Sequence, residues 1–300
     1  MAEVNALPWN GLNVVSTFSG GGGSCTGYRM AGYRVLWANE FIESARETYR
    51  ANHPTSILDP RDIRTVQPEE ILAATGLAVG ELDLFDGSPP CSAFSTAGKR
   101  HKGWGKTKAY SDDAAQVVDD LFFEYTRLLR GLKPRAFVAE NVSGLVKGSA
   151  KGYFKLILQE LKACGYEVRA AVVNARWLGV PQSRERLLFV GVRSDLGIAP
   201  SHPAPQAGGY SIADALEGLD APVEPETNMS RFAVGAEWRR LRPGGQSEKY
   251  FSLVRCDPRL PVPTITAASG GPSVASVSHP TECRKFSVAE VKRLSGSQSD

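Results

Sequence analysis

Short apolar runs alternate with amphipathic stretches through the first two thirds of this 300-residue chain. The runs are rich in Val, Leu and Phe and predict buried strands at residues 12–18, 33–39, 59–63 (as the end of a strand region), 82–85, 136–139, 166–173 and 186–192. Apolar residues at helical spacing predict helices ending at residue 30 and covering residues 41–52, 68–74, 112–132 and 153–164. This alternation indicates an α/β fold with a doubly wound, mostly parallel sheet.

The pattern changes after Arg193. Residues 194–227 are rich in Pro, Gly and Ala and predict one short helix at residues 212–219. Residues 231–259 hold seven basic and three acidic residues together with four aromatic ones. We therefore expect a main domain over residues 1–192, a small irregular domain with a basic, aromatic surface over 193–280, and a segment returning to the main domain over 281–300.

Composition narrows the class of protein. A hydrophobic fraction of 42% and a charged fraction of 22% are typical of a folded globular chain, and a net charge of +3 favours a polyanionic partner only weakly. The five cysteines are scattered without a CxxC pair and the four histidines lie far apart. We expect no zinc site and no disulfide framework, which fits a reducing cytosol, and we expect no signal peptide or membrane span.

A run of glycines follows the first predicted strand. Strand, glycine loop and helix together are typical of a nucleotide-type cofactor site. Cys25 stands where the dinucleotide fingerprint needs its third glycine, and no Gly-Lys-Ser/Thr ends the run. Glu40, at the end of the second strand, is placed to accept bonds from ribose hydroxyls. The alternatives are a plain turn and a solvated glutamate at a helix N-terminus.

Cys91 lies in the stretch DLFDGSPPCSAFS (residues 83–95), just beyond a predicted strand. Two prolines make the turn stiff, and open α/β sheets place their reactive groups at the carboxyl ends of strands. A thiol there is a candidate nucleophile, although a buried structural cysteine is the alternative.

Further charged residues fall at the ends of other predicted strands. Glu140 ends the fifth strand, and Arg184 and Arg186 alternate so that they would share one face of a strand. Residues 99–108 mix basic residues with glycines and one tryptophan, which suits a loop that closes over a phosphate backbone. A helix-capping glutamate, exposed arginines and a solvated loop are the alternatives.

In order and spacing these features resemble the cytosine-C5 DNA methyltransferases of bacteria and phages, over nearly the whole chain. FSGGGG (residues 18–23) looks like the family's cofactor motif, and PC (90–91) like its catalytic motif. ENV (140–142), QSRER (182–186) and PTIT (263–266) match further signatures. The resemblance implies a Rossmann-like S-adenosylmethionine-dependent sheet with a small target-recognition domain, acting in the bacterial cytosol as a monomer on double-stranded DNA.

The resemblance also implies a mechanism. Cys91 would add to C6 of a cytosine flipped out of the duplex, so that C5 can attack the methyl group of S-adenosylmethionine and leave S-adenosylhomocysteine. Glu140 would bond to or protonate ring N3, and Arg186, helped by Arg184, would bind O2. No metal is implied.

The resemblance assigns two larger sets of residues. The cofactor contacts it implies are Phe18, Ser19, Gly20, Gly22, Gly23, Glu40, Phe41, Asp62, Ile63, Pro90 and Leu121. The DNA contacts it implies, together with the basic stretches, are Ser95, Lys99, Arg100, Lys102, Arg239, Arg240 and Arg255.

Two departures from the family pattern bear on function. Ser92 stands where the family usually has Gln after Pro-Cys. Only the start of the last motif is present at residues 284–294, so we expect truncation within it, an uncovered apolar face beside residues 12–18 and weak cofactor binding. The alternatives are a tRNA cytosine methyltransferase, whose Cys-Phe-Thr signature is missing here, and a DNA-binding relic without activity.

Overall fold

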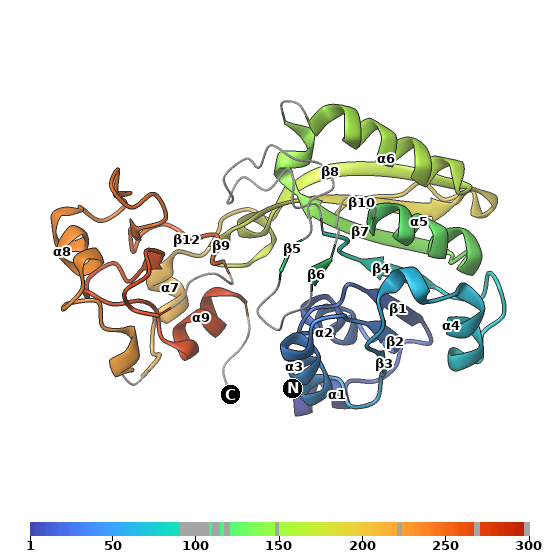
Figure 1. Cartoon of the computed structure of the whole chain (residues 1–300), viewed down its shortest axis with the longest axis horizontal. Helices are drawn as coiled ribbons and strands as arrows, with labels where there is room; N and C mark the ends of the chain where they lie inside the picture. The colour runs from blue at the N-terminus through green and yellow to red at the C-terminus, as the bar shows by residue number, and fades with distance from the viewer. Residues whose placement is uncertain are drawn as a thin grey trace. The chain divides into compact units, whose positions relative to one another are not determined.

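The computed structural model describes residues 1–90, 108–109, 115–116, 121–147, 150–220, 224–266 and 271–296. The chain divides into two compact units. The first unit comprises residues 1–172 and 186–202, and the second comprises residues 173–185 and 203–300 (Figure 1).

The first unit extends ten residues beyond the expected boundary at residue 192. Arg193 explains why the chain remains tied to this unit. Its backbone N–H donates to the carbonyl of Arg135 (2.9 Å), and its guanidinium donates to the carbonyls of Gly80 (3.1 Å) and Lys133 (2.6 Å). Contacts of this kind are invisible in a composition profile.

A seven-stranded sheet forms the centre of the first unit, in the order β3-β2-β1-β4-β7-β10-β8. Its strands are β1 (Asn13–Thr17), β2 (Arg34–Asn39), β3 (Ile57–Asp59), β4 (Leu84–Gly87), β7 (Ala136–Val142), β8 (Tyr166–Asn174) and β10 (Glu185–Arg193). The pairs β1–β2, β2–β3, β1–β4 and β4–β7 are parallel, and β10 is antiparallel to β7. The predicted doubly wound, mostly parallel α/β sheet is confirmed, with its switch point between β1 and β4.

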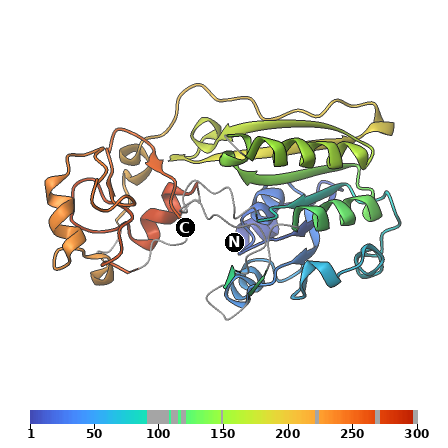
Figure 2. The ribbon, with the colours of Figure 1, turned by 45° about the horizontal axis from the view of Figure 1, so that its top comes forward.

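Successive residues of a strand point to opposite faces of the sheet. Both faces are apolar here, and helices cover each of them. Val14 and Leu84 belong to one apolar cluster, which includes Cys25 and Tyr49 on α2 (Gly23–Met30) and α3 (Glu43–Asn52). Val15, next to Val14, belongs to the larger cluster against α4 (Pro68–Thr75), α5 (Leu121–Leu132) and α6 (Lys151–Ala163). Figure 2 shows α5 and α6 along the same face.

The expectation of an uncovered apolar face beside the first strand is wrong. Val14 and Val15 are 0% and 1% exposed. The N-terminal helix α1 (Ala2–Ala6) is tied to the same region, because the Asn5 side chain donates to the carbonyl of Asn52 and Arg29 donates to the carbonyl of Asn5.

Two expected elements differ in the structure. The third strand ends at Asp59, and Ile63–Thr65 form a 3₁₀ turn that Asp62 caps by accepting the N–H of Arg64. The helix expected from residue 112 is described only from Leu121, whereas Ala115–Gln116 form strand β6, which pairs with β5 (Lys108–Ala109). Strand pairing here overrides the local helical pattern.

The second unit holds short elements around two small apolar clusters. Its elements are β9 (Gln182–Ser183), α7 (Ile212–Leu216), α8 (Ala233–Arg240), β11 (Val254–Arg255), β12 (Val262–Pro263), β13 (Val277–Ser278) and α9 (Val288–Leu294). Residues 281–296, expected to lead back to the main domain, pack here: Leu294 of α9 shares a cluster with Ile212 of α7. Across the described part of the chain, no helix has the length and apolar character needed to cross a bilayer.

Gly87 should not tolerate a side chain. A Cβ at Gly87 would lie 2.6 Å from both Thr17 Oγ1 and Tyr125 Cε2, inside a packed core. We expect Gly87→Ala to lower the free energy of unfolding by about 1–3 kcal/mol, measured by thermal or urea denaturation. Gly27→Ala is the matched control, because an added Cβ on that exposed face of α2 meets nothing within 4 Å and should stabilise the helix. Equal stability of the two variants would contradict this packing argument.

Candidate active site

The ends of the parallel strands lie side by side along one edge of the sheet. The register pairs Asn39 with Thr17, Thr17 with Gly87, and Gly87 with Ala139. The residues that follow these four in sequence therefore lie at the same edge of the sheet. They are Glu40, Phe18, Ser88 and Glu140. In a doubly wound sheet this edge is where ligands bind.

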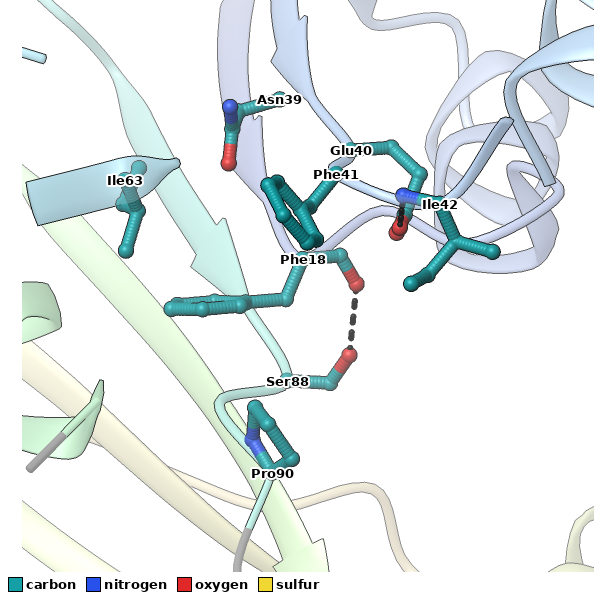
Figure 3. Close-up of a pocket in the computed structure, with 8 residues that line it drawn as sticks. All are labelled: Phe18, Asn39, Glu40, Phe41, Ile42, Ile63, Ser88 and Pro90. Atoms are coloured by element: carbon teal, nitrogen blue, oxygen red, sulfur yellow. Dashed lines mark hydrogen bonds between the residues drawn. The ribbon is translucent and has the colours of Figure 1, made fainter. Parts of the chain in front are cut away.

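A pocket of about 200 Å³ opens at this edge (Figure 3). It is lined by Phe18, Asn39, Glu40, Phe41, Ile42, Ile63, Ser88 and Pro90. Five of these residues coincide with predicted cofactor contacts, whereas Asn39, Ile42 and Ser88 were not predicted. Their signal in the sequence is only their position next to residues that end strands, which no motif marks.

Phe18 adopts a backbone conformation that is unusual for a bulky residue. Its φ of 53° lies in the left-handed region, which costs energy for any residue with a Cβ. The Ser88 hydroxyl donates to the Phe18 carbonyl at 2.9 Å, as Figure 3 shows, and this bond helps to hold the conformation. The loops after β1 and β4 are thus joined at the pocket.

Glu40 is oriented by the backbone on both sides of it. One carboxylate oxygen accepts the N–H of Gly20 (2.8 Å) and the other accepts the N–H of Ile42 (2.8 Å). The side chain is only 8% exposed. A carboxylate oxygen has two acceptor positions, so Glu40 can still accept a hydroxyl from a ligand.

The glycine loop is packed tightly against α3. Gly22 has a φ of 89°, and a Cβ there would lie 2.4 Å from the His53 ring, so only glycine fits. His53 Nε2 lies 3.0 Å from the Gly22 carbonyl, and burial lowers the pKa of the imidazole. Ser19 is fixed as well, since its N–H donates to the Asn39 carbonyl and its hydroxyl to Ser16. Gly23 begins α2.

The remaining predicted cofactor contacts have different surroundings. Ile63 faces the pocket, and Arg127 fixes its backbone by donating to the Ile63 carbonyl at 3.0 Å. Asp62 caps the 3₁₀ turn and forms an ion pair with Arg64 (3.1 Å). Leu121 is 0% exposed and belongs to the main core.

Two predicted catalytic residues meet beside the pocket edge. Arg186 Nε donates to Glu140 Oε1 at 2.5 Å, across the antiparallel strands β10 and β7. Next to Glu140, the buried Asn141 donates to the carbonyl of Pro89 at 3.2 Å, which anchors the proline turn to β7. Cys91, the predicted nucleophile, lies outside the described residues.

Residues 12–300 match the sequence pattern of the family described as C-5 cytosine-specific DNA methylase. The chain belongs to this family. Among curated relatives it is 35% identical to the Type II methyltransferase M.NgoPII of Neisseria gonorrhoeae, over 68% of this chain and 54% of that protein. It is 32% identical to the Type II methyltransferase M.SacI of Streptomyces achromogenes, over 94% of this chain and 83% of that protein. The chain thus spans about half the length of the first relative and most of the second.

A solved structure supports the same fold. An Escherichia coli prophage-encoded protein described as a DNA modification methyltransferase superposes with a TM-score of 0.71 at 22% identity, covering 94% of this chain and 88% of that one. At this level of identity the likeness concerns the fold, which for the methylase family is the S-adenosylmethionine-dependent α/β sheet. Among the residues that the structure describes, no three His, Cys, Asp or Glu side chains are grouped as metal ligands.

Arg184, a predicted catalytic residue of this methylase chain, does not share a strand with Arg186. It falls in the break between β9 and β10 and belongs to the second unit. Its guanidinium donates to the carbonyl of Ile265 at 3.4 Å, and its backbone N–H donates to the Asn174 side chain at 3.1 Å. The expectation that the two arginines would share one face of a strand therefore does not apply, because Arg184 lies outside β10.

The predicted DNA contacts divide into three groups. Ser95, Lys99, Arg100 and Lys102 lie outside the described residues. Arg239 and Arg240 are exposed in the last turn of α8, Arg240 with 80% of its side chain accessible. Arg255 makes contacts within the second unit. Its guanidinium stacks over Trp238 and donates to the carbonyls of Pro280 (2.9 Å) and Leu241 (2.9 Å).

Phe18 and Leu121 were both assigned to the cofactor, and the structure predicts that they respond differently to truncation. Leu121→Ala should leave a cavity in the core and lower the free energy of unfolding by about 2–5 kcal/mol. Phe18→Ala should mainly weaken binding of S-adenosylhomocysteine, because Phe18 lines the pocket. Urea denaturation and calorimetric titration of both variants measure the two effects. Weaker binding by Leu121→Ala at unchanged stability would reverse the assignment.

Proposed function

We propose that this methylase transfers a methyl group from S-adenosylmethionine to C5 of a cytosine in double-stranded DNA, through a covalent bond between Cys91 and C6. The observation that carries the proposal is the shared edge of the sheet. Pro90, which lines the pocket, directly precedes Cys91, and the ion pair of Glu140 and Arg186 occupies the strand end next to that turn.

The pocket fits the cofactor by its chemistry. Phe18, Phe41 and Ile63 provide apolar surface for a purine ring, and Glu40 provides a fixed acceptor for ribose hydroxyls. Bound there, S-adenosylmethionine would supply an electrophilic methyl group. Asp62, Ser19, Gly20, Gly22 and Gly23 would act by shaping the two loops that border the pocket.

The protein residues would perform the remaining chemistry. The Cys91 thiolate adds to C6, and the electron pair of the C5–C6 bond moves to C5. Glu140, in its protonated form, donates a proton or a hydrogen bond to N3, while the Arg186 guanidinium bonds to O2 and stabilises the charge that develops there. After C5 is methylated, its proton is lost, the C6–S bond breaks and the thiolate leaves. The target base must leave the duplex for Cys91 to reach C6.

The test of the reaction uses the whole chain with tritiated S-adenosylmethionine. The substrates are duplex DNA from a host without cytosine methylation and, in parallel, unmodified tRNA. We expect label in 5-methylcytosine of the DNA, and a covalent protein–DNA adduct with randomised duplexes that contain 5-fluorocytosine. Label in the tRNA alone would favour the RNA enzyme, and no label in either would favour the inactive DNA-binding chain.

Cys91→Ser should abolish methyl transfer and the 5-fluorocytosine adduct, because a hydroxyl is a far weaker nucleophile than a thiolate. The volume of the side chain is nearly unchanged, so the fold and DNA binding should persist in circular dichroism and gel-shift measurements. Cys283→Ser, a half-buried cysteine in the second unit, is the matched control and should react normally. An adduct that survives Cys91→Ser would assign the nucleophile elsewhere.

Arg239→Ala or Arg240→Ala should weaken DNA binding, since both side chains are exposed on α8. Loss of a phosphate contact should lower the slope of log K against log salt by about one unit, whereas loss of a base contact should relax sequence preference. Fluorescence anisotropy across salt concentrations distinguishes these outcomes. Wild-type slopes and affinities for both variants would show that α8 does not face the DNA.

A further inference from the structure

The proposed mechanism assigns no role to the buried carboxylate of Asp86. Asp86 on β4 is only 5% exposed. Its Oδ2 accepts hydroxyl bonds from Ser16 and Ser24, each at 2.9 Å, and its Oδ1 accepts the Tyr28 hydroxyl at 2.9 Å.

These bonds join three separate elements. Ser16 belongs to β1, while Ser24 and Tyr28 are four residues apart and so lie on one face of α2. Ser24 follows Gly23, the first residue of α2, directly after the glycine loop. Ser16 also accepts the Ser19 hydroxyl at 3.0 Å, which extends the network into that loop. Asp86 thus fixes both the start and the second turn of α2 to β4.

The same strand leads into the proposed nucleophile. Ser88 and Pro90 follow Asp86 by two and four residues and line the pocket, and Cys91 is the next residue. Ser88 holds the carbonyl of Phe18. The end of β4 is therefore tied to the loop after β1 at the pocket by Ser88, and to α2 behind that loop by Asp86.

Stability alone gives little reason for a carboxyl group at this position. Burial raises the pKa of Asp86, and its negative charge contributes to the raised pKa of Cys25 and of Tyr28. Apolar residues that replace a buried polar network are often neutral or stabilising. The hydrogen bonds of Asp86 do, however, impose one geometry on the elements they join, which an apolar contact would not.

We propose that Asp86 is a positioning residue: through Ser24, Tyr28 and Ser16 it holds the cofactor loop and residues 88–90, which precede Cys91, in the arrangement that methyl transfer requires. This inference rests on the proposed function. Asp86 is not among the residues that line the pocket, so it would act through the two loops that border it.

The test substitutions are Asp86→Asn, which keeps the size of the side chain, and the double variant Ser24→Ala with Tyr28→Phe, which keeps the carboxylate. The readouts are kcat and KM for methylation of unmethylated duplex DNA, affinity for S-adenosylhomocysteine by calorimetry, and Tm. We expect kcat to fall about 10- to 100-fold in both, as small misplacements of reacting groups do, with KM for DNA unchanged and cofactor affinity reduced.

Asp83→Asn is the matched control at the other end of β4. Asp83 accepts the N–H of Asn13 (2.9 Å) and pairs with Arg135 (3.5 Å), away from the pocket. It should lower Tm while kcat and cofactor affinity stay at wild-type values. Should Asp86→Asn fail to fold, the double variant carries the test.

The experiment distinguishes failure of the positioning role of Asp86 from failure of the proposed function. Wild-type kcat and cofactor affinity in the Asp86→Asn or double variant would overturn the positioning role and leave the proposed function intact. A wild-type chain that binds S-adenosylhomocysteine but never methylates DNA would overturn the proposed function, and the cofactor affinities of the variants would then still decide whether Asp86 positions the loop. A wild-type chain without cofactor affinity would overturn both.

Discussion

The register of four parallel strands is the constraint on which the candidate site depends. Because Asn39, Thr17, Gly87 and Ala139 lie side by side, the residues that follow them converge although they are far apart in sequence. A shift of β4 by one residue would exchange its two faces. Asp86 would then point at the core and Gly87 at the polar face of α2, and neither environment suits the residue it would receive.

Asp86 and Gly87, the last two residues of β4, face opposite sides of the sheet, where one side is packed closely and the other is polar. On one face Gly87 has no side chain, so the Tyr125 ring can approach the backbone and stack on Phe85 with ring centroids 4.6 Å apart. On the other face Asp86 accepts three side-chain hydroxyls. Close packing on one side and fixed hydrogen bonds on the other hold the end of β4 rigidly, and in the proposed mechanism this strand end precedes the nucleophile Cys91.

Much of the fold follows from the sequence, because buried strands need continuous apolar runs and those runs are visible. Glu40 could be assigned for the same reason, since it directly follows such a run, whereas Phe18 was assigned through the family's glycine-loop motif. Ser88 and Ile42 could not, because they contribute through a hydroxyl bond to a distant carbonyl and through a backbone N–H. Asp86 could not be assigned for a related reason: an acid just after an apolar run looks like part of the polar turn until its three hydroxyl partners, 58 to 70 residues away, are known.

In the second unit, the number of basic residues in the sequence is larger than the number of basic side chains that face solvent. Of the seven basic residues between positions 231 and 259, six are exposed, but Arg255 is stacked on Trp238 and bonded to two carbonyls. Arg284 is likewise buried in a two-pronged ion pair with Glu290. The second unit has few strands and therefore few backbone–backbone hydrogen bonds between its segments. Guanidinium groups that donate to carbonyls on separate loops connect these segments instead. The positive charge of the second unit is thus divided between holding the unit together and facing solvent, and only the solvent-facing share can contact DNA.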